Sequence, residues 1–70
     1  MTPSLRQAVE SAQALVAKAK GLESDANDED AEELRAMLVD LQAAVERGSE
    51  DDIRVALREV EELVFYLEDA

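Results

Sequence analysis

Hydrophobic residues recur at helical spacing in three separate stretches of this chain, and this pattern constrains the fold more than any other feature. Within each stretch they lie three or four residues apart, which places them on one face of an α-helix. The first face contains Leu5, Ala8, Val9, Ala12, Leu15, Val16 and Ala19. The second contains Leu34, Met37, Leu38, Leu41, Ala44 and Val45. The third contains Ile53, Ala56, Leu57, Val60, Leu63, Val64 and Leu67.

These three faces predict an all-α protein whose helices form one antiparallel three-helix bundle. We expect helices near residues 4–20, 28–47 and 50–68, within a single domain that covers residues 1–70. A chain of 70 residues is close to the smallest size that folds without a disulfide or a metal, so one shared core is expected. The connecting segments are short, which favours helices that alternate in direction.

The first helix has a recognisable start and end. It is expected to open at Thr2, Pro3 or Ser4, because proline is favoured in the first helical turn. Ser4 and Gln7 have the spacing of a capping box, in which two side chains satisfy free backbone N–H groups. Gly21 is expected to end the helix in the left-handed conformation that glycine adopts easily.

The other helix boundaries are also marked by capping residues. Residues 22–27 are expected to form the first loop, after which Asn27 or Asp28 caps the second helix. Gly48 should end that helix, and Ser49 should cap the third helix directly. A break this short predicts a tight antiparallel pair of helices.

The charge of the chain is strongly acidic and unevenly distributed. The net charge is −11, and residues 21–70 carry seventeen of the 18 acids but only four of the seven bases. Such a surface repels nucleic acids and anionic membranes, so we expect neither as a partner. No apolar run is long enough to span a bilayer, and the first twenty residues do not resemble a signal peptide, so a cytoplasmic location is expected.

The residue types needed for most catalytic and metal sites are missing. The chain has no histidine and no cysteine, so its serine and threonine hydroxyls lack the usual general base. The carboxylates Glu59, Glu61 and Glu62 are interpreted as a hydrated outer face rather than as an acid–base pair. We therefore predict no enzymatic activity, no cofactor and no small-molecule substrate.

An acidic stretch at residues 23–33 invites comparison with a calcium-binding loop. It holds seven carboxylates and no base. An EF-hand loop requires glycine at its sixth position and glutamate at its twelfth, but a loop starting at Asp25 has Asp30 and Ala36 there. We interpret the acids instead as favourable charges at the start of the second helix, and we predict no metal site.

Four large apolar residues lie away from the three hydrophobic faces: Val39, Val55, Phe65 and Tyr66. They allow two interpretations. Each helix of a three-helix bundle touches two others, so these side chains could widen the buried faces. Alternatively, they form an exposed contact surface for a partner protein or a second copy of the chain. Tyr66 suits a contact best, because its hydroxyl group requires water or a polar partner.

Several segments of the chain resemble a known family. The acidic loop is followed by ELRAMLVDL at residues 33–41, then by GSEDDI at 48–53 and EELVFYL at 61–67. In this order they resemble the C-terminal helical lid of the seventy-kilodalton heat-shock chaperones of the DnaK type, over most of residues 8–67. The resemblance implies a helical bundle. The nucleotide-binding domain and the peptide-binding β-sandwich of that family have no counterpart here, so no ATP or peptide site is implied.

The sequence thus favours a non-catalytic helical module, similar to a DnaK-type lid, that acts by protein contacts through its helix faces. The alternative is a small homo-oligomeric interaction or regulatory protein unrelated to chaperones. In both cases the expected partner is a protein, either another chain or a second copy.

Overall fold

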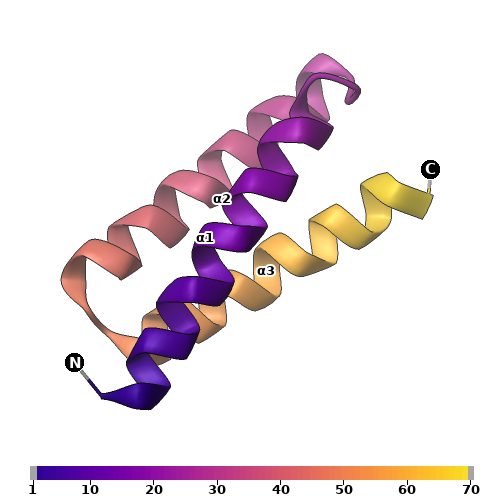
Figure 1. Ribbon diagram of the computed structural model, residues 1–70. Coiled ribbons are helices and arrows are strands. Elements are labelled where there is room, and N and C mark those ends of the chain that lie inside the picture. Colours follow the sequence, from indigo (N-terminus) through magenta and orange to yellow (C-terminus); the bar gives the residue numbers. More distant parts are fainter. Residues whose placement is uncertain (1, 70) are drawn as a thin grey trace.

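Three helices make up almost the whole chain in the computed structural model, which describes residues 2–69. Helix α1 spans Pro3–Glu23, α2 spans Asp28–Arg47 and α3 spans Glu50–Asp69. Helix α2 runs back alongside α1, and α3 then returns in the direction of α1 (Figure 1). All three pairs of helices are in contact, within a body measuring 37 × 18 × 16 Å. The predicted all-α, antiparallel three-helix bundle is confirmed.

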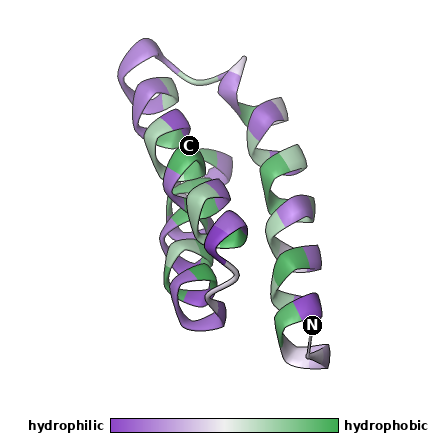
Figure 2. Cartoon of the chain, turned by 90° about the vertical axis from the view of Figure 1, so that its left-hand side faces the viewer, coloured by the Kyte–Doolittle hydropathy of each residue, from purple (hydrophilic) through white to green (hydrophobic). Residues whose placement is uncertain are grey.

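The hydrophobic faces predicted from the sequence form the core. Hydrophobic and hydrophilic residues alternate along each helix at helical spacing (Figure 2). The largest fully buried side chains are Leu34, Leu41, Ile53 and Val60, which come from α2 and α3. Among residues 2–69 no polar or charged residue is buried, so nothing in this core requires an internal hydrogen-bond partner.

Helix α1 contributes a different kind of surface from the other two. Its buried residues are the alanines Ala8, Ala12 and Ala19, whereas its larger apolar side chains are only half-buried at the edges of the face. The methyl groups of these alanines share one core with the leucine, isoleucine and valine side chains of α2 and α3. Burying alanine also costs no side-chain conformational entropy.

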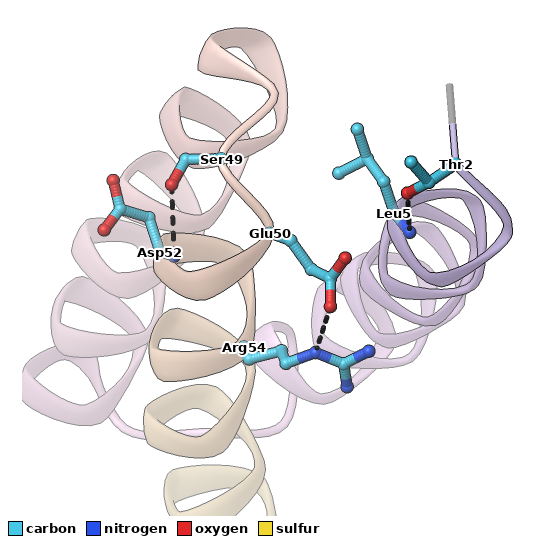
Figure 3. Close-up of polar contacts among 6 residues, drawn as sticks. All are labelled: Thr2, Leu5, Ser49, Glu50, Asp52 and Arg54. Carbon is cyan, nitrogen blue, oxygen red and sulfur yellow. Dashed lines mark hydrogen bonds and ion pairs between the residues drawn. The ribbon is translucent and has the colours of Figure 1, made fainter.

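The start of α1 differs from the predicted capping box. Thr2 is the N-cap: its hydroxyl oxygen accepts a hydrogen bond from the backbone N–H of Leu5 at 3.2 Å (Figure 3). Ser4 lies inside the first turn, so the Ser4–Gln7 capping box is wrong. Pro3 occupies the first helical position, where its ring fits and its missing N–H is not needed. With Pro3 there, the preceding Thr2 is held in the extended conformation that an N-cap requires.

The end of α1 also lies beyond the predicted one. Gly21 is not in the left-handed conformation, and the helix continues through it to Glu23. The N–H groups of Asp25 and Ala26 both donate to the carbonyl oxygen of Leu22 at 3.1 Å, so a turn closes the helix without a left-handed residue. Leu22 therefore belongs to the helix, where it packs against the core, and the loop is shorter than predicted.

The remaining boundaries agree with the sequence. The Asn27 side chain caps α2 by accepting a hydrogen bond from the N–H of Asp30 at 2.8 Å. Gly48 ends α2 in the left-handed conformation, with φ of 69°. The Ser49 hydroxyl oxygen then accepts from the N–H of Asp52 at 3.4 Å, as Figure 3 shows. Two residues thus suffice to reverse the chain between α2 and α3.

The two glycines provide a test of these boundaries. Gly48→Ala should lower the free energy of unfolding by about 1 kcal/mol, because a side chain disfavours the left-handed conformation. Gly21→Ala should raise it by about 0.5–1 kcal/mol, because Gly21 is helical and a methyl group there meets nothing within 4 Å. Urea unfolding of both variants measures the difference. Destabilisation by both substitutions would contradict the position assigned to the end of α1.

Candidate functional site

The four apolar residues outside the predicted faces are all exposed. Their exposed fractions are 73% for Phe65, 63% for Tyr66 and Val39, and 60% for Val55. The interpretation in which they widen the buried faces is therefore wrong. The core closes without them, and their side chains are accessible to another molecule.

Two of the four share one side of α3. Val55, Glu59, Glu62 and Tyr66 follow one another at intervals of four, three and four residues, which places them in a stripe along the helix. This stripe borders α2. Val55 lines one open hollow between α2 and α3, Tyr66 lines a second, and Glu59 lines both. We call the two hollows together the α2–α3 groove.

The α2–α3 groove has an apolar floor. The floor side chains are at least half-buried: Met37, Ala44, Ala56 and Leu63. Val55 and Tyr66 stand at its α3 edge, one in each hollow. The groove thus consists of two shallow hollows that share Glu59, each with apolar side chains on its floor, and it has an aromatic ring near the C-terminal end of α3.

The edges of the α2–α3 groove are acidic. Six carboxylates line it: Asp30, Glu33, Asp40, Asp52, Glu59 and Glu62. One basic residue, Arg47, lies among them, and its guanidinium group pairs with Asp52 at 3.3 Å. Within residues 2–69 the other five carboxylates have no ion-pair partner. The groove therefore combines an apolar floor with a negative charge that little in the described chain offsets.

Phe65 lies in a different groove from its neighbour Tyr66. Successive helical residues are rotated by about 100°, so Phe65 points towards the α1 side of α3, where it lines a hollow with Leu15 and Lys18. Charges on the α1 side are mixed: Lys18 pairs with Glu68 at 3.2 Å, and Arg54 with Glu50 at 3.1 Å.

Val39 is separate from both of these surfaces. It is two positions from the fully buried Leu41, so it points roughly opposite to the core face of α2. Phe65, Val39 and the Val55–Tyr66 pair thus lie on three different parts of the exterior. The structure brings together Val55 and Tyr66 along one groove, and it does not bring the other two to them.

A fourth hollow, between α1 and α2, is the least charged of these surfaces. Its floor is Ala12 and Leu41, and its edges include Val16 and Val45. Among residues 2–69, Glu46 is the one charged residue that lines it. None of the four exposed apolar side chains lies there. This hollow therefore offers little that projects towards a partner.

The acidic stretch at residues 23–33 is divided between the end of α1, the loop and the first turns of α2. Asp28, Glu29 and Asp30 occupy the first turn of α2, where carboxylates are favoured by the helix dipole. Glu23 forms an ion pair with Arg35, which ties the end of α1 to α2. In residues 2–69 no group of three or more histidine, cysteine or acidic side chains is arranged to hold a metal ion.

None of the three helices, over the part of the chain that the structure describes, is both long and apolar enough to cross a bilayer.

Comparison with known proteins does not place the chain in a family. It has no match among protein-family models, curated proteins or solved structures.

The sequence did not reveal the groove residues Met37, Glu59 and Glu62 as parts of one surface. Met37 lies on the predicted core face, and it does pack against the core while it also lines the groove. The two glutamates lie on the predicted hydrated outer face, although the sequence does show the regular spacing from Val55 to Tyr66. That spacing indicates a shared stripe. It does not indicate which neighbouring helix the stripe borders.

The crowded carboxylates of the groove should affect stability. Glu59→Gln should raise the free energy of unfolding by about 0.3–0.5 kcal/mol at low salt, because Glu59 lines both acidic hollows. Glu50→Gln should lower it by a similar amount, because Glu50 pairs with Arg54. Both effects should shrink in about 1 M salt, where charges are screened over roughly 3 Å. Urea unfolding at two salt concentrations measures them, and stabilisation by Glu50→Gln would contradict this description.

Proposed function

We propose that this protein is a non-catalytic helical module that acts by binding another protein through an exposed helix face. The observation that carries the proposal is the exposure of Tyr66 and Val55 beside an apolar groove floor. The core is complete without these two side chains, so the stability of the bundle does not account for them.

The composition of this surface supports a protein contact. Aromatic residues and methionine are enriched at protein interfaces, and the α2–α3 groove contains both Tyr66 and Met37. A tyrosine can bury its ring against apolar groups while its hydroxyl group keeps a polar partner. Tyr66 is therefore the residue that we expect to contribute most to binding.

The resemblance to the helical lid of DnaK-type chaperones agrees with this proposal. That lid is also a helical bundle, and the resembling segments here supply residues on α2 and α3. We propose the likeness as one of architecture and mode of action. Because the chain contains no histidine or cysteine, its chemistry also favours binding over catalysis.

The second candidate function is self-association through the α1 side of α3. It is favoured by Phe65, the most exposed of the four apolar residues, whose surroundings carry charges of both signs. Mixed charges permit two identical surfaces to meet. Two α2–α3 grooves would repel each other, because each carries an excess of carboxylates.

Site-specific photo-crosslinking tests the proposal. A photoreactive amino acid replaces Tyr66 in one variant, Phe65 in a second and the exposed Lys20 in a control, each expressed in cells that naturally produce the protein. We expect the Tyr66 variant to form an adduct with a different protein, and the Lys20 variant to form none. Circular dichroism checks that each variant remains helical.

The adducts separate the two candidate functions. Crosslinking at Phe65 between two copies of the chain, with nothing at Tyr66, would favour self-association. An absence of protein adducts at both positions in folded variants would contradict the proposed function.

A further inference from the structure

We propose that the α2–α3 groove binds a basic amphipathic helix of a partner protein. This inference rests on the proposed function and specifies the chemistry of the partner. The surface that carries it is the apolar floor of the groove, edged by carboxylates that have no ion-pair partner within residues 2–69.

The shape of the groove suits a helix. The groove follows two packed helices from Asp30 to Arg47 on α2, which is about 26 Å at the helical rise. A partner helix of roughly 17 residues has this length. An amphipathic helix places its apolar side chains in such a channel at intervals of three and four residues. Here they would contact Met37, Leu63 and Tyr66 in one hollow, and Val55 and Ala56 in the other.

The negative charge of the groove favours a partner helix that has basic residues beside its apolar face. Carboxylates stand on both edges: Asp30, Glu33 and Asp40 on α2 face Glu59 and Glu62 on α3. Lysine or arginine side chains that flank the apolar stripe of the partner would lie beside them. Charge complementarity of this kind speeds association and excludes acidic competitors.

The same charge argues against other occupants. Nucleic acids and anionic membranes carry the wrong sign. A second copy of this chain is acidic overall, and its α1 is the helix with an excess of bases. The apolar face of α1 is already buried in its own bundle, so it is not free to enter the groove.

The probe is a synthetic peptide of about 18 residues, made of leucine and lysine, with leucines spaced to form one face of a helix. A control peptide has the same composition with its leucines spread around the helix. Calorimetry measures the affinity for the intact chain. Tyr66 is the one tyrosine and the chain has no tryptophan, so tyrosine fluorescence reports directly on this groove.

The variants compare the two sides of α3. Tyr66→Ser should weaken binding of the amphipathic peptide by about tenfold or more, as expected for an aromatic anchor. Phe65→Ser is the matched control, because Phe65 is the neighbouring aromatic residue on the other groove, and it should leave the affinity unchanged.

A second pair of variants tests the charges. Glu59→Gln should weaken binding roughly two- to fivefold at low salt and reduce the salt dependence. Glu46→Gln, in the α1–α2 hollow, is the control and should have a smaller effect.

Several outcomes would overturn the inference. Equal affinity for the control peptide would mean attraction by charge alone, without the groove. Equal losses for Tyr66→Ser and Phe65→Ser would place the contact elsewhere. If sedimentation showed that the chain alone forms a dimer, and that Tyr66→Ser makes it monomeric, the occupant of the groove would be a second copy of the chain.

Failure of this inference is distinguishable from failure of the proposed function. If the photoreactive group at position 66 captures a protein whose contacting segment is not basic, the partner chemistry is wrong while the protein-binding function stands. If neither position 66 nor position 65 captures a protein, the proposed function itself is contradicted.

Discussion

The structure depends on the contact between the alanine face of α1 and the branched side chains of α2 and α3. Ala12 and Ala19 are almost completely buried, and they belong to the same core cluster as Leu34, Leu41 and Ile53. The buried positions of α1 are all alanines, whereas α2 and α3 also bury leucine, isoleucine and valine, and within residues 2–69 the interior is filled without a polar group. This division lets 70 residues enclose a core that needs no aromatic side chain.

A core closed in this way leaves the remaining apolar residues available for other roles. Because the hydrophobic faces of the three helices already pack against one another, Val55 and Tyr66 lie beside a groove rather than within the bundle. The packing of the helices also determines which charged residues lie close enough to form ion pairs. Basic residues of α1 and α3 form pairs on the α1 side, as Lys18 does with Glu68, whereas the α2–α3 side keeps most of its carboxylates unpaired within residues 2–69.

The helices and the core could be predicted from the sequence because helical spacing is a local property. The caps at Asn27 and Gly48 could be predicted for the same reason. The predictions for Ser4 and Gly21 were wrong because neighbouring residues have a stronger effect. Pro3 determines where α1 starts, and packing of the last turn of α1 against the core extends the helix beyond Gly21. The α2–α3 groove could not be predicted from the sequence, because the spacing of residues within one helix does not show which side of that helix borders which neighbouring helix.

The most direct test of the account is the stability of a variant in which the four exposed apolar residues are replaced by serine: Val39, Val55, Phe65 and Tyr66. Serine has a helix propensity close to those of the residues it replaces, so urea unfolding at low protein concentration reports on packing alone. We predict a free energy of unfolding within about 1 kcal/mol of the original, whereas Leu41→Ala alone should cost about 2–5 kcal/mol. A loss in the four-serine variant as large as that of Leu41→Ala would show that these side chains belong to the core, and the account would be wrong.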